Sequence, residues 1–101
     1  YGIEVETGWT EIFYANKNHP DTVPIIKAAA EKAALQSEGR DTPFKWGEDF
    51  GLFTEKYKGA MFGIGSGVDQ PALHNPDYDY PDELTETGVN MFRNIIDEIL
   101  T

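Results

Sequence analysis

The spacing of apolar residues constrains the fold of this chain most, because it changes from alternating to helical along the sequence. The first apolar residues alternate with glutamates, which is typical of a half-buried strand over residues 2–8. The last segment carries apolar residues at helical spacing from Leu84 to Ile99, which predicts a helix over 81–100. A chain that combines both periods is expected to pack helices against a sheet.

The first half of the chain repeats the same two patterns. A short extended piece is expected over 12–14. It is followed by a helix over 21–36, with Pro24 in the first turn and a stop at Gly39. The alanine-rich face of this helix allows another element to pack closely. Further along, the apolar run 60–65 predicts a buried strand.

A second helix is expected between these segments, over 48–58. Glu48 and Asp49 would occupy its first turn, where carboxylates suit the helix dipole. The same two carboxylates are candidates for orienting a loop or a ligand at a cleft. The resulting order of elements is strand, helix, strand, helix, strand, loop and helix. It predicts an α/β fold in which strands alternate with three helices.

Charge and composition narrow the classes of partner. The 101 residues include 8 basic and 18 acidic side chains, which gives a net charge of −10. Nothing offsets phosphate repulsion, so we expect no binding to nucleic acid or to an anionic membrane surface. No apolar run approaches the roughly 18 residues of a membrane span. The absence of cysteine excludes thiolate chemistry and fits a reducing compartment, so we expect a cytoplasmic protein.

Three glycines at alternate positions, Gly63, Gly65 and Gly67, follow the predicted strand. Their spacing does not match the dinucleotide-binding pattern, and no Lys-Ser or Lys-Thr pair follows to make a phosphate loop. Two interpretations stay open. The glycines can serve tight backbone geometry at the end of a strand, or their bare backbone can line a ligand cleft. The second interpretation makes Gly65 a candidate substrate-binding residue.

The acidic cluster after residue 76 does not form a calcium loop. An EF-hand that began at Asp77 would need glycine at its sixth position and glutamate at its twelfth, where the chain has Asp82 and Gly88. The cluster is therefore interpreted as solvated residues at the start of a helix. The two serines, Ser37 and Ser66, lie outside any G-x-S-x-G motif, so no catalytic nucleophile is assigned.

His74 is the remaining candidate for chemistry. The other histidine, His19, lies in a separate loop, and no H-x-x-x-H or H-x-D spacing is present. Metal sites need three or four protein ligands. From the residues alone, His74 is a possible ligand without a complete site.

Six short motifs occur in order over 47–89, and they are Glu48-Asp49-Phe50, Lys58-Gly59, Gly63-x-Gly65, Leu73-His74-Asn75-Pro76, Tyr78-Asp79-Tyr80 and Gly88-Val89. Together they resemble the C-terminal end of a metal-dependent amidohydrolase family. This family comprises the aminoacylases, hippurate hydrolases and indole-acetyl-amino-acid hydrolases, and it is related to zinc carboxypeptidases of the glutamate-releasing type. Lys58 stands where that family usually has proline.

The resemblance implies a function for a longer parent enzyme. Residues 1–16 would be the end of a lid or dimerisation domain and its return strand, and 17–101 would be the C-terminal part of a zinc-exopeptidase-like catalytic domain. The parent would hydrolyse the amide bond of N-acyl amino acids or small peptides. Two divalent ions, of zinc, manganese, cobalt or nickel, would assist it.

The resemblance also assigns residues. His74 would be a ligand of one metal ion, and Glu48, Asp49, Gly65 and Asn75 are expected on the substrate side. The other ligands and the catalytic base would lie on chain outside this sequence. We therefore expect this chain alone to be inactive and without bound metal, and to associate with the rest of its own enzyme or with itself.

An alternative stays open beside the resemblance. The chain could be a self-standing acidic α/β module that binds or assembles without catalysis. A self-contained enzyme would need several ligands and a base in one chain, and one candidate ligand is found here.

Overall fold

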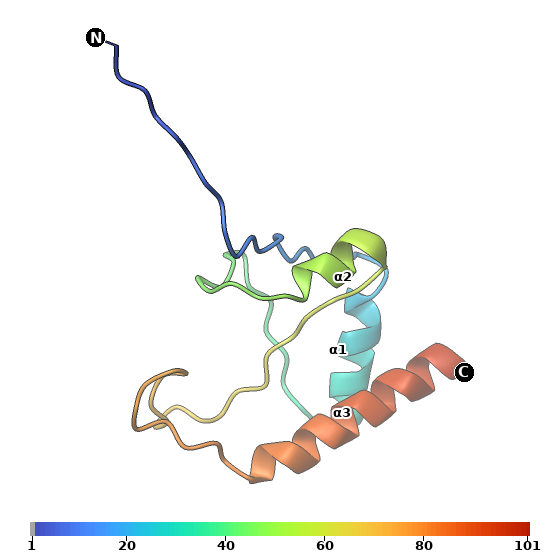
Figure 1. The fold of residues 1–101 in the computed structure, drawn as a ribbon. Helices are drawn as coiled ribbons and strands as arrows, with labels where there is room; N and C mark the ends of the chain where they lie inside the picture. Colours follow the sequence, from blue (N-terminus) through green and yellow to red (C-terminus); the bar gives the residue numbers. More distant parts are fainter. Residues whose placement is uncertain (1) are drawn as a thin grey trace.

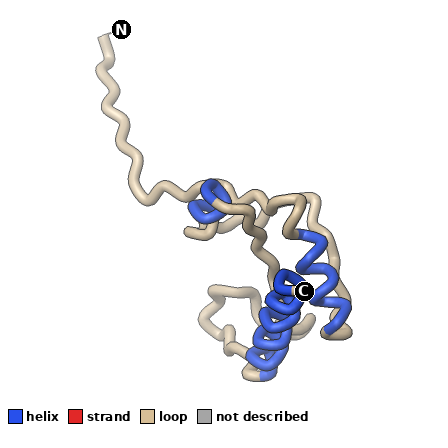
Figure 2. Tube along the Cα trace, turned by 90° about the vertical axis from the view of Figure 1, so that its right-hand side faces the viewer, coloured by secondary structure: helices blue, strands red, loops and turns tan. Residues whose placement is uncertain are grey.

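The computed structural model describes residues 2–101, and within them it contains three helices and no strand (Figure 2). Helix α1 spans Val23–Lys32, α2 spans Gly51–Lys56 and α3 spans Glu83–Leu100. The predicted α/β class is therefore wrong for the described part of the chain, which is helical. The long C-terminal helix is confirmed, and its start differs by two residues from the predicted one.

Helix α1 begins two residues after its expected start and ends four residues before its expected end. Pro24 lies in its first turn, where a missing N–H costs nothing. The end is set by Ala34, whose φ of 55° is left-handed. Leu35 N–H donates to Ala30 C=O (2.9 Å), and Ala34 N–H donates to Glu31 C=O (3.0 Å), which is a Schellman motif. The predicted stop at Gly39 is therefore wrong, because an alanine takes the left-handed position first.

The core lies where α1 crosses α3. Ala29, Ala30 and Met91 are its buried residues. The small alanines let α3 approach closely, as the alanine-rich face predicted. Asn94 Nδ2 donates to Ala29 C=O across the helix pair (3.1 Å). A salt bridge between Lys32 and Glu98, at the far end of the helix pair, also joins α1 to α3.

Helix α2 is shorter than the predicted 48–58. Its first residue is Gly51, so Glu48 and Asp49 precede the helix instead of occupying its first turn. The chain enters α2 through a turn in which Asp49 C=O accepts from Leu52 N–H (3.1 Å). The predicted effect of these two carboxylates on the helix dipole is therefore wrong.

The segments predicted as strands are extended without forming a ladder. Alternation at Ile3 and Val5 predicted half-burial, yet these side chains are 81% and 77% exposed. Segment 60–65 is partly buried beside the helices. It meets the 16–19 loop through Met61, whose C=O accepts from Asn18 Nδ2 (2.8 Å) and whose N–H donates to Asn18 Oδ1 (2.9 Å). A period of two favours extended backbone, but a strand also needs a partner, and the described residues supply none.

The molecule is elongated because its N-terminal arm leaves the body (Figure 1). The arm, residues 2–10, carries no helix and ends far from α3. The molecule measures 64 × 37 × 21 Å, and its radius of gyration is 17.9 Å. A compact chain of 100 residues has a radius of gyration of about 13 Å.

Much apolar surface remains uncovered, and a large part of it is on α3. Large apolar side chains that are at least half exposed on this helix are Val89, Phe92, Ile96, Ile99 and Leu100.

Candidate metal-ligand loop

His74 lies in the irregular loop 66–80, which runs from the half-buried segment 60–65 to the start of α3 (Figure 1). Two consecutive turns shape the loop. Asn75 N–H donates to Ala72 C=O (3.0 Å), and Tyr78 N–H donates to Asn75 C=O (3.0 Å). Asn75 thus closes the first turn and opens the second. We call the segment Ala72–Tyr78 the double turn.

The backbone of His74 is left-handed, with a φ of 74°. His74 is the third residue of the first turn, and Leu73 before it does not have a positive φ. A positive φ at the third position alone is the mark of a type II turn, which favours glycine or asparagine there. A histidine in this conformation costs roughly 1–2 kcal/mol.

The side chains that could hold a metal do not converge within residues 2–101. No group of three or more His, Cys, Asp or Glu side chains among them is placed to bind one ion. His74 is exposed on its loop. Its imidazole fits a divalent transition metal as a single nitrogen ligand, and the described residues do not complete the ligand set.

The other residues expected near substrate are exposed and lie on different segments. Gly65 precedes loop 66–80 and Asn75 is part of the double turn, whereas Glu48 and Asp49 precede α2. Glu48 lines a cleft of about 710 Å³, and His74 does not line it. The described residues therefore do not gather these side chains around His74.

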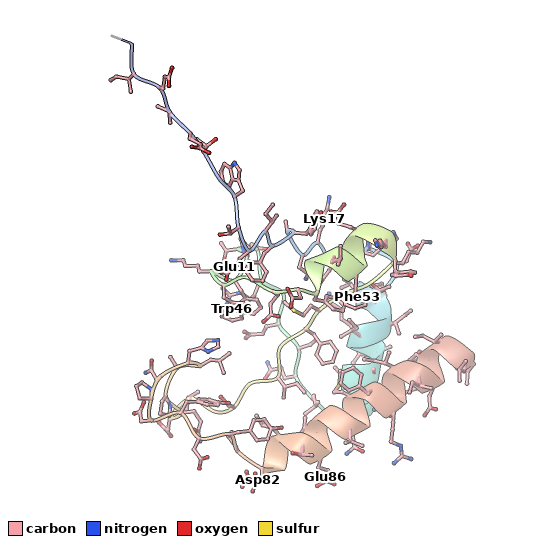
Figure 3. All side chains as sticks on the ribbon, viewed as in Figure 1. Glu11, Lys17, Trp46, Phe53, Asp82 and Glu86 are labelled. Carbon is pink, nitrogen blue, oxygen red and sulfur yellow. The ribbon has the colours of Figure 1, made fainter. Side chains whose placement is uncertain are left out.

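This cleft is aromatic, and the sequence analysis did not single it out. The rings of Phe44 and Trp46 stack at 4.2 Å, and the Arg40 guanidinium lies 4.5 Å from the centre of the Phe44 ring. Figure 3 shows Trp46 at the foot of the N-terminal arm near Glu11, away from α3. The only signal in the sequence is the close spacing of two aromatic residues after Pro43.

A second, apolar groove of about 680 Å³ runs along α3. The loop before α3 contributes Leu73 and Tyr78, and the helix contributes Val89 and Phe92. Arg93 is the one charged residue in its lining. The groove adjoins the double turn without including His74.

His19 belongs to a separate polar cluster at the start of α1. Its Nδ1 accepts a hydrogen bond from Asp21 N–H (3.1 Å). Lys58 Nζ lies 2.8 Å from Asp21 Oδ2, and this contact lowers the pKa of the Asp21 carboxyl below its ordinary value. His19 therefore takes part in ordering the turn that precedes α1.

None of the helices within residues 2–101 has the length and apolar character needed to cross a bilayer.

Comparison with known proteins places the chain in a protein family. No curated protein and no solved structure matches the chain. A family model described as peptidase family M20/M25/M40 matches residues 2–98.

Proposed function

The chain belongs to peptidase family M20/M25/M40, and from this membership we propose that it supplies the C-terminal part of a metal-dependent amidohydrolase. The substrates would be N-acyl amino acids or small peptides. The motifs from Glu48 to Val89 support this choice within the family, because they occur in the order of the aminoacylase and hippurate hydrolase group.

The observation that carries the proposal is the conformation of His74. An exposed histidine in an unfavourable left-handed backbone gives the loop no packing and costs it stability. Strained backbone of this kind concentrates at functional sites. We therefore propose that the His74 imidazole is a metal ligand, and that further chain supplies the other ligands.

Two divalent ions in such a site would polarise the amide carbonyl and lower the pKa of a bound water. The part of this chain would be to hold one imidazole nitrogen, in its neutral form, toward one of those ions. Asn75, Gly65 and the carboxylates of Glu48 and Asp49 are proposed to face the substrate once the domain is complete.

The uncovered apolar surface supports a larger domain. Phe92 and Ile96 on α3 are 60% and 53% exposed. Apolar patches of this kind mark surfaces that meet another element or partner. The rest of the enzyme is the proposed partner of this face.

The test of the ligand role is His74→Ala in the full-length enzyme, with His19→Ala as the matched control. We expect His74→Ala to lower the metal content and to reduce turnover by about two orders of magnitude or more, because charge in the transition state loses its counter-ion. Thermal stability should not fall. His19→Ala should keep its metal.

Two results would contradict the proposal. Unchanged metal content with near-normal turnover would make His74 an ordinary loop residue. Loss of the folded state in His74→Ala without metal would make its role structural.

A further inference from the structure

We propose that the double turn positions the His74 imidazole through the backbone, and that Pro76 is the positioning residue. The purpose of this device rests on the proposed function. Its mechanism rests on the geometry of Ala72–Tyr78 alone.

The first step is the choice of residue at the third position of the type II turn. Glycine fits a positive φ without cost, and asparagine tolerates it. Histidine occurs at positive φ more often than most residues, but its Cβ keeps a steric cost that glycine does not have. His74 is exposed, so packing does not offset that cost. Folding of the loop alone would therefore favour another residue at position 74, and the imidazole has a use outside the loop.

The second step is the exit from that turn. Pro76 is the second residue of the Asn75–Tyr78 turn, where its ring fixes φ near −65°. The same ring restricts Asn75 before it to extended backbone. Asn75 N–H closes the turn that contains His74. Pro76 thus limits the freedom of the residue whose N–H holds His74 in place.

The third step is the absence of packing around His74 and Asn75 themselves. Both are exposed, and the residues of the double turn that line the apolar groove along α3 are Leu73 and Tyr78. At His74 and Asn75, the two turn hydrogen bonds and the proline ring are therefore the restraints that the structure shows. In this loop the turn conformation restrains the backbone, a role that burial has in most sites. The imidazole therefore stays accessible to a metal ion.

The first experiment compares four variants of the 101-residue chain, namely His74→Gly, His74→Asn, His74→Ala and His74→Val. The measured quantity is the hydrogen-exchange rate of the Asn75 amide, corrected for the intrinsic exchange rate of each sequence. We expect exchange in His74→Gly to be about five- to thirtyfold slower than in His74→Ala, which corresponds to about 1–2 kcal/mol. Asparagine should resemble glycine, and valine should be fastest. Leu73 is the control position, because its φ is not positive. The Asn75 amide should exchange faster in Leu73→Gly than in Leu73→Ala.

The second experiment compares Pro76→Ala with Pro71→Ala, which lies in the same loop outside the double turn. In the unaltered chain His74 should show a strong intraresidue HN–Hα NOE and unequal Hα–Hβ couplings. In Pro76→Ala the His74 NOE should be lost and its couplings should average. In Pro71→Ala both His74 signals should stay as they are, and the His19 signals should be the same in every sample. These signals report the direction of the imidazole, which a merely structural proline would leave unaltered.

The inference is overturned if glycine and alanine at position 74 exchange equally, or if Pro76→Ala leaves the His74 signals as they were. Failure of this inference and failure of the proposed function give different results. An ordered double turn in an enzyme whose His74→Ala variant keeps its metal would sink the ligand role alone. A disordered turn in an enzyme whose His74→Ala variant loses metal would sink the positioning role alone.

Discussion

Gly51, the first residue of α2, lies against the backbone of Tyr14. A Cβ added at this glycine would stand 2.1 Å from the Tyr14 carbonyl oxygen, which is far inside van der Waals contact. We expect Gly51→Ala to destabilise the chain by about 1–3 kcal/mol, because the backbone must move to admit the methyl group. The measurement is thermal unfolding followed by helical circular dichroism.

Gly39→Ala is the matched control for this substitution, since a Cβ there meets nothing within 4 Å. Equal stability of the Gly51→Ala and Gly39→Ala chains would show that α2 does not lie against Tyr14.

At the same scale, Asp21 makes a pH-dependent contribution. A hydrogen bond and charge from Lys58 lower the pKa of its carboxyl below the ordinary 3.8. Because the pKa is lower in the folded chain, the contribution is present above the unfolded pKa. It is lost as the pH falls through the folded value. Lys58→Ala should raise the Asp21 pKa toward 3.8, as measured by NMR titration of its carboxyl carbon.

Lys56→Ala removes a charge of the same sign from α2 without touching Asp21, and it should leave this pKa where it is. A shift of equal size in both variants would mean that net charge, and not the Lys58 contact, lowers the Asp21 pKa.

The pairing of α1 with α3 includes a hydrogen bond from one side chain to the backbone of the other helix. Asn94 Nδ2 donates to Ala29 C=O at 3.1 Å. We expect Asn94→Ala to lower stability by about 0.5–1.5 kcal/mol, the usual net contribution of a hydrogen bond. Asn90→Ala on the exposed face of α3 is the control and should stay within about 0.5 kcal/mol of the unaltered chain. Equal effects would place the Asn94 contribution in helix propensity instead.

Helix α3 also contains a glycine that its own propensity disfavours. A Cβ at Gly88 would meet only Ile64 Cδ1, at an ordinary 3.8 Å. Gly88→Ala should therefore stabilise the chain by up to about 1 kcal/mol, raising the midpoint of thermal unfolding. A lower midpoint would mean that another element comes closer to Gly88 than Ile64 does.

Sequence periodicity located the helices better than it located their ends or their partners. The stripe from Leu84 to Ile99 predicted α3 almost to the residue, because burial of one face produces the pattern directly. The stop of α1 was missed, since a Schellman motif at Ala34 has no glycine to announce it. The predicted strands were wrong for a different reason. Alternation describes one segment, whereas a ladder is a property of two.

The sequence singled out a candidate residue and not its geometry. The Leu73-His74-Asn75-Pro76 motif drew attention to His74, and the structure places this residue in an exposed loop where the described residues form no group of metal ligands. Its positive φ was not predicted, because histidine is only enriched at such positions and does not require them as glycine in a type II turn often does. The alanine-rich face of α1 was expected to let another element pack closely, and α3 packs against it.

For the whole molecule, uncovered apolar surface predicts association. Phe92 and Ile96 are more than half exposed on α3 and line the apolar groove. We expect the 101-residue chain to self-associate as its concentration rises, and Phe92→Asp with Ile96→Asp to reduce this association while α3 stays helical. Sedimentation velocity measures the first effect and circular dichroism the second. A monodisperse monomer at high concentration would contradict the expectation.

A second expectation for the whole molecule concerns the absence of catalysis by the 101-residue chain alone. Metal-assisted hydrolysis needs several ligands on one ion, and we expect the 101-residue chain with added Zn²⁺ not to hydrolyse hippurate-like substrates. Turnover that co-purifies with the chain and disappears in His74→Ala would contradict this expectation and give the chain an activity of its own.

The crossing of α1 and α3 has a consequence for synthesis on the ribosome. The bond between Asn94 and Ala29 joins residues 65 positions apart. At 5–20 residues per second, α1 emerges roughly 3 to 13 s before the helix that covers it. Throughout that interval α3 cannot yet cover the alanine face and Ile26 of α1. A chaperone that shields apolar surface would have its main opportunity to act on this protein then.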